Sequence, residues 1–169
     1  LGLMVVFNTT VHEGNFHHIP NLVRFFIAQS AEIGLVSFQL QAETGRGEWG
    51  SRDALITQQS MKKQIETGSA RTLPWGVVDF GHSDCHSYMP TTVVNNRVFP
   101  VIGERTLFGH FLSHFEHIRT DRHATSFQVL MDYGLALLKR PRSWWPAVSY
   151  AVGQLRQMGK HLLLGRGQV

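Results

Sequence analysis

Two apolar runs near the start of the chain, residues 3–7 and 35–40, carry polar residues at or just after their ends. Amide, hydroxyl and guanidinium groups can orient a polar cofactor or bind a carboxylate or phosphate, and glycine lets the backbone approach a ligand. The alternative is ordinary loop and capping chemistry. We predict cofactor or substrate binding by Asn8, Thr10, Asn15, Gln39, Gly45 and Arg46.

A second group of reactive side chains lies in the segment FGHSDCHSY, where Cys85 stands between His82 and His86. Imidazole and thiolate are ligands for zinc, iron or a metal cluster. No Lys or Arg lies in the segment to lower the thiol pKa, so its local charge does not favour a free nucleophile. We predict a metal site at Cys85, His82 and His86; the alternative is a buried cysteine between surface histidines.

A third group is His110, His114 and His117, whose spacing brings three imidazoles within about 60° on a helix. Such a face can reach one metal ion. The opposite side of the same helix is rich in phenylalanine, and the face opposite an apolar stripe is usually solvated. Both interpretations of the three histidines stay open.

The elements that would position the first group form a βαβ unit. Residues 3–7 are predicted to form a strand that is buried on both faces. Residues 35–40 are predicted to form a second strand. Between them Pro20 suits the first turn of a helix that continues to Ala31, with Gly34 as its stop. A crossover of this length makes the strands parallel, so their carboxyl ends meet at one rim of the sheet.

Later segments predict a hairpin and further helices. A helix capped by Asp53 or Thr57 is expected to stop at Gly68. The run TTVV–NN–RVFPVI reads as a β-hairpin, because asparagine tolerates the positive φ of tight turns. Pro100 restricts the second strand to an edge. Three more helices are predicted over residues 107–118, 126–139 and 144–163.

The run VVFNTTVHEGN-x₅-NLVRFFIAQ followed by VSFQLQAETGRG resembles the last two βα units of a radical S-adenosylmethionine enzyme barrel. It is similar to the subgroup that includes tetraether-lipid synthases, closely over residues 1–47 and more loosely over 48–100. The resemblance implies a partial TIM-like barrel, a [4Fe–4S] cluster on a C-x-x-x-C-x-x-C loop, and S-adenosylmethionine as cofactor. Reductive cleavage of that cofactor then leads to hydrogen abstraction from a substrate. Extra clusters in the subgroup favour Cys85 as a cluster ligand.

The chain departs from that family in its cysteines. Cys85 is the only one, so the C-x-x-x-C-x-x-C motif is absent, as is the family's G-G-E-P-like strand end. We therefore expect these 169 residues to be the C-terminal part of a larger enzyme and inactive alone. The expected organisation is α/β: terminal βαβ units of a partial barrel over 1–75, then a C-terminal region with a hairpin and helices over 76–169.

Charge is uneven along the chain. Residues 1–118 carry 8 Lys and Arg against 10 Asp and Glu, whereas residues 119–169 carry 8 against 2. Paired tryptophans beside these cations resemble a lipid-facing helix, although a packed helix with snorkelling cations is the alternative.

The partners that we expect are therefore a small-molecule or lipid substrate and a peripheral membrane contact through the basic C-terminal helices. We do not expect nucleic acid as a partner, since no DNA- or RNA-recognition motif accompanies the positive charge. The expected location is the cytoplasm, with or without membrane association. The rival function is a non-catalytic module that binds a metal or a membrane surface.

Overall fold

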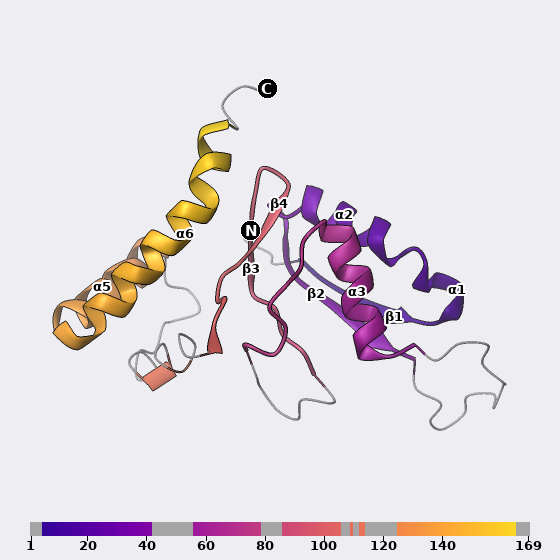
Figure 1. The fold of residues 1–169 in the computed structure, drawn as a ribbon, viewed down its shortest axis with the longest axis horizontal. Coiled ribbons are helices and arrows are strands. Elements are labelled where there is room, and N and C mark those ends of the chain that lie inside the picture. The colour runs from indigo at the N-terminus through magenta and orange to yellow at the C-terminus, as the bar shows by residue number, and fades with distance from the viewer. Residues whose placement is uncertain are drawn as a thin grey trace. The chain divides into compact units, whose positions relative to one another are not determined.

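The structure is a computed structural model, and it describes residues 5–41, 56–78, 86–105, 109, 112–113 and 125–164. Figure 1 shows a chain of mixed helix and strand, in agreement with the α/β prediction. The chain divides into two compact units. Unit 1 comprises residues 1–73 and 96–98, and unit 2 comprises residues 74–95 and 99–169. The elements, in chain order, are β1 (Val5–Val11), α1 (Glu13–Phe16), α2 (Ile19–Ala28), β2 (Ile33–Leu40), α3 (Gln58–Ser69), β3 (Thr91–Val94), β4 (Arg97–Pro100), α5 (Ser126–Leu138), the 3₁₀ turn η1 (Pro141–Ser143) and α6 (Trp144–Leu164).

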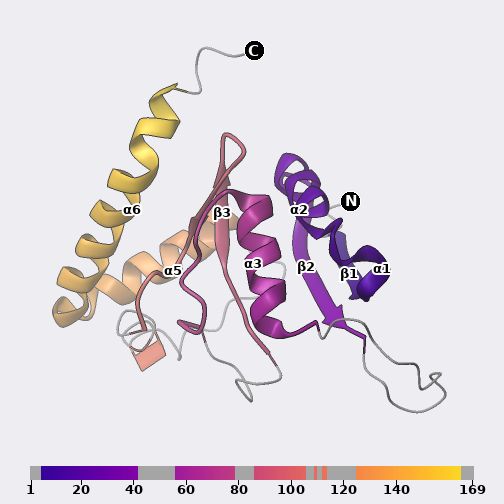
Figure 2. The ribbon, with the colours of Figure 1, turned by 45° about the vertical axis from the view of Figure 1, so that its right-hand side comes forward.

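Unit 1 contains the predicted βαβ arrangement. β1 and β2 pair in parallel, from Val6 beside Leu35 to Val11 beside Leu40, and α2 makes the crossover between them. α2 runs along one side of the two strands, and α3 packs beside α2 (Figure 2). The core of the unit contains Val11, Ile19, Val23 and Met61.

Three boundaries in unit 1 differ from the prediction. β1 continues through Asn8, Thr9 and Thr10 instead of ending at Phe7, because threonine and the alternating pattern suit a strand. α2 ends at Ala28, whose C-cap is Gln29, and Gly34 lies inside β2 instead of stopping the helix. β1 is also not buried as predicted: Val5, Val6 and Phe7 are all at least one third exposed, although the ring of Phe7 contacts α2.

Gly68 has a packing role that the sequence did not indicate. We predicted it as the stop of α3, but the helix continues to Ser69 and ends at Ala70, which adopts a left-handed conformation. A Cβ at Gly68 would lie 2.6 Å from the Cβ of Val23 and 2.8 Å from the carbonyl oxygen of Pro20. Glycine therefore allows α3 to approach the backbone of α2 closely.

The predicted hairpin is confirmed. β3 and β4 form a two-stranded sheet, and the turn between them is Asn95–Asn96. Both residues have positive φ, 50° and 57°, as a tight hairpin turn requires.

The two C-terminal helices also agree with the prediction, and η1 joins them. α5 begins after Thr125, whose hydroxyl accepts a hydrogen bond from the backbone N–H of Gln128. Among the described helices, none combines the length and the apolar character needed to cross a membrane.

Candidate functional site

The face of the β1–β2 sheet that α2 covers is identified by aromatic contacts. The ring of Phe26 in α2 lies 5.0 Å from the ring of Phe7 and 6.2 Å from that of Phe38. Because side chains alternate along a strand, every second residue from Phe7 and Phe38 shares this covered face. The buried Val11 and the half-buried Leu40 belong to it.

The opposite face carries three of the residues predicted to bind a ligand. Asn8 and Thr10 project from β1 on the side away from α2, and so does Gln39 from β2. The parallel register places Thr10 directly beside Gln39 and Asn8 beside Ser37. The pairing thus brings together side chains that are about thirty residues apart in sequence.

This face, which we call the open face, has two chemical zones. Toward the start of the strands lie the exposed apolar side chains of Val6 and Leu35. Toward the carboxyl ends lie two amides and two hydroxyls. An apolar floor with converging polar groups at one end is the usual composition of a small-molecule site. The full set on the open face is Val6, Asn8, Thr10, Leu35, Ser37 and Gln39.

Ser37 was not predicted as a site residue. It is half-buried within the apolar run of β2, so we assigned it to the strand and not to the site. Its position two residues before Gln39 was the available signal, because residues two apart in a strand share a face.

Asn15 lies in α1, the short helix that follows β1. Its side-chain amide donates to the carbonyl oxygen of Thr10 at 2.8 Å, and its side-chain oxygen accepts from the backbone N–H of His12 at 2.9 Å. His12 in turn accepts through Nδ1 from the backbone N–H of Gly14, which completes a capping box for α1. The amide of Asn15 is thus engaged in fixing the chain where it leaves the site.

The remaining predicted positions are mostly outside the described residues. Gly45, Arg46, His82 and Cys85 lie there, as do His110, His114 and His117. His86 is described: it is exposed, and its ring stacks at 6.1 Å from that of Tyr88. Over the described ranges, no three His, Cys, Asp or Glu side chains are grouped as a metal site would need. The metal role of Cys85, His82 and His86 stays a prediction.

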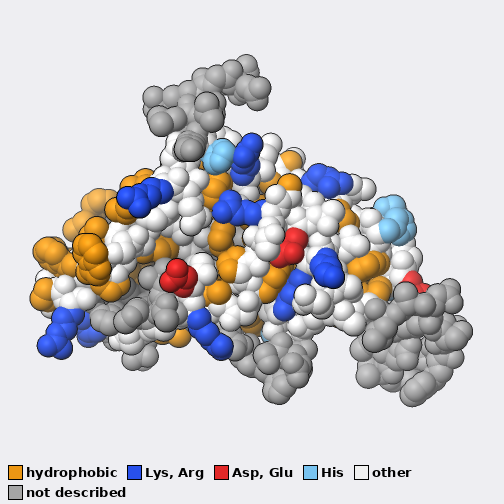
Figure 3. All heavy atoms as spheres, viewed as in Figure 1, with side chains coloured by type: hydrophobic (Ala, Val, Ile, Leu, Met, Phe, Trp, Pro, Cys, Tyr) orange, Lys and Arg blue, Asp and Glu red, His pale blue; other side chains and the backbone are white. Residues whose placement is uncertain are grey.

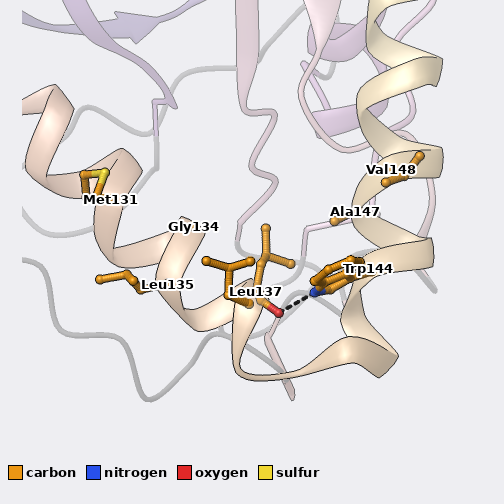
Figure 4. A pocket seen from close by; sticks show the side chains of 8 residues that line it. Met131, Gly134, Leu135, Leu137, Trp144, Ala147 and Val148 are labelled. Atoms are coloured by element: carbon orange, nitrogen blue, oxygen red, sulfur yellow. Dashed lines mark hydrogen bonds between the residues drawn. The ribbon is translucent and has the colours of Figure 1, made fainter.

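Unit 2 has a groove between α5 and α6, shown in Figure 4. Its volume is about 410 Å³. The indole N–H of Trp144 donates to the carbonyl oxygen of Leu137 at 2.6 Å, which holds the turn between the helices. The groove is lined by Met131, Gly134, Leu135, Leu137, Leu138, Trp144, Ala147 and Val148.

Farther along α6, burial raises the pKa of Tyr150 above its ordinary value of 10.0.

Comparison with known proteins gives no match to this chain among family models, curated proteins or solved structures.

Proposed function

We propose that unit 1 is the end of a partial βα barrel in a radical S-adenosylmethionine enzyme, and that its open face binds the cofactor. The observation that carries this proposal is the placement of Asn8, Thr10 and Gln39 on one face, away from the crossover helix.

The distribution of covered and open faces supports a barrel. In a βα barrel the helices cover the outer face of the sheet, and ligands bind at the carboxyl ends of the strands. α2 packs on one face of β1 and β2 through Phe26, whereas the other face has no helix of this crossover on it and carries the exposed side chains of Val6 and Leu35. A two-stranded sheet with one bare apolar face is marginal in water, so further strands would be expected to complete this layer.

The polar groups of the open face suit the cofactor that we propose. Adenine, ribose and the methionine carboxylate all offer hydrogen-bonding edges that amide and hydroxyl groups can recognise. Thr10 and Gln39 lie side by side and can bind the same polar part of a ligand. Asn8 lies two residues earlier in β1, nearer to the exposed apolar side chains at the start of the strands. When bound beside a reduced cluster, the cofactor supplies the radical chemistry. This chain's own residues hold and orient it.

The cluster needs cysteines beyond the single one of this chain, because thiolates are its ligands. The test therefore uses protein expressed from the complete reading frame and reconstituted anaerobically with iron and sulfide. We expect this protein to bind S-adenosylmethionine and to release 5′-deoxyadenosine when reduced. The 169-residue chain alone should release none above a no-protein control.

Single variants then test the open face. Asn8→Ala and Gln39→Ala should each weaken S-adenosylmethionine binding by up to about tenfold, the value of one hydrogen bond to a ligand. Gln59→Ala is the matched control, since Gln59 is an exposed residue of α3, and its binding should equal that of wild type. Wild-type affinity in both open-face variants would contradict the proposal.

A further inference from the structure

The helices α5 and α6 each expose a continuous apolar stripe. In α5 the stripe is Phe127, Met131, Leu135 and Leu138, with exposed fractions between 45% and 69%. In α6 it is Trp144, Val148, Val152 and Leu155, with the neighbouring Trp145 exposed to 78%. Spacings of four, four and three residues place each set on one side of its helix. Figure 3 shows hydrophobic side chains gathered over the region where Figure 1 draws these helices.

The apolar stripe of α6 is not the side by which the helix is held. Gln154 donates to the carbonyl oxygens of Pro100 and Val101 at 3.1 and 3.0 Å, and the ring of His161 lies 5.6 Å from that of Phe99. At 100° per residue, positions 154 and 161 lie about 115° and 135° around the helix from the middle of the stripe. The helix is thus anchored through one side while its apolar side stays exposed.

The turn between the helices adds positive charge to the apolar surface. Lys139, Arg140 and Arg142 follow α5 directly, and all three are exposed. Residues 126–164, which form the two helices and their turn, contain five Lys and Arg and one acidic residue, Asp132. In sequence, cationic residues therefore border the ends of both stripes, at Leu138 of α5 and Trp144 of α6.

We propose that the α5–α6 hairpin docks on an anionic membrane surface, with its turn and apolar stripes inserted at the level of the lipid headgroups. Exposed apolar stripes, tryptophan and flanking cations are the features of helices that lie in the membrane interface. Charge decides against a second copy of this chain as the occupant. Over residues 126–164 the same hairpin of a second copy would offer five Lys and Arg and one carboxylate, Asp132, whereas an anionic lipid surface offers complementary charge throughout.

The test measures co-sedimentation of the chain with vesicles of phosphatidylcholine, with and without phosphatidylglycerol. Wild type should bind only the anionic vesicles. The triple variant Lys139→Gln, Arg140→Gln and Arg142→Gln should bind them roughly 100-fold more weakly, because each cation near an anionic surface contributes several-fold. The matched control is Arg24→Gln, Lys63→Gln and Arg97→Gln. It removes the same charge from exposed positions elsewhere and should bind within about threefold of wild type.

A second pair of variants tests the apolar contribution. Trp145→Ser should weaken binding by roughly tenfold without unfolding the chain, since the side chain is the most exposed of the set. Phe25→Ser, an exposed aromatic of α2, should bind as wild type. Two outcomes would overturn the proposal. One is an equal loss of vesicle binding in the two triple variants. The other is that the chain binds no vesicles and instead forms concentration-dependent dimers, which Trp145→Ser dissociates. The outcome is independent of S-adenosylmethionine binding at the open face, because the probe is lipid alone.

Discussion

The helices of the two units use their apolar residues in opposite ways. In unit 1, α2 buries Val23 and Phe26, and α3 contributes the buried Met61. In unit 2, α5 and α6 leave a stripe of large apolar side chains in solvent. The difference is the basis of our proposal for α5 and α6: the helices of unit 1 bury their apolar side chains within the unit, whereas α5 and α6 leave theirs exposed.

Backbone spacing shows the same contrast. Gly68 is the point where α3 comes too close to α2 for a Cβ to fit, and the pair is therefore packed helix against helix. At Gly134, Gly153 and Gly159 in α5 and α6, an added Cβ would meet nothing within 4 Å. Close packing positions the open face of the sheet in unit 1, while the open arrangement in unit 2 leaves the groove accessible.

The largest expected effect is at Phe26. Phe26→Ala removes a ring that is only 7% exposed and that contacts Phe7 and Phe38, so we expect a loss of about 3–5 kcal/mol in unfolding free energy. Phe127→Ala removes an equally large ring that is 69% exposed, and the change should stay within about 0.5 kcal/mol. Urea unfolding followed by circular dichroism gives both values. Similar losses in the two variants would remove the distinction between the units.

Local sequence chemistry was sufficient for the elements whose geometry is set locally. The Asn95–Asn96 turn was predicted because asparagine adopts positive φ, and the turn has that conformation. Thr57 was one of two predicted caps for α3, and it does cap the helix, accepting from the backbone N–H of Ser60 at 3.1 Å. In these places the nearest residues decide the structure.

Features that depend on contacts distant in sequence were missed. Gly68 was interpreted as a helix stop because its neighbour α2 is about forty-five residues away in sequence. That Asn8, Thr10 and Gln39 lie near one another was predicted, whereas the face of the sheet that they share could be assigned only from the strand register and the contacts of Phe26.

The next largest effects are expected at two helix glycines. Replacing each with alanine should change the free energy of unfolding in opposite directions. Gly68→Ala should destabilise unit 1 by about 1–3 kcal/mol, since the new methyl would overlap Val23 and the backbone at Pro20. Gly153→Ala should stabilise α6 by about 0.5–1 kcal/mol, because the methyl meets nothing and alanine favours the helix. Hydrogen–deuterium exchange locates each change: faster exchange in α2 and α3 for the first, slower in α6 for the second. Destabilisation by both substitutions would show that α6 packs as tightly as α3.

The smallest effect concerns Tyr150, which tests how far α6 is buried on its anchored side. Burial raises the pKa of Tyr150, so the folded chain holds the phenol proton more tightly than the unfolded chain. The contribution to stability is complete below pH 10.0, the ordinary pKa, and it declines as the pH rises toward the raised pKa of the folded state. Tyr150→Phe keeps the ring and removes the proton, so its unfolding free energy should fall less steeply above pH 10.0 than that of wild type. The comparison is made by urea unfolding across this range, with phenolate absorbance as a direct titration. If the two slopes coincide, the half-buried side of α6 is as accessible to water as its apolar stripe, and the contrast between the anchored and the exposed apolar sides of this helix is lost.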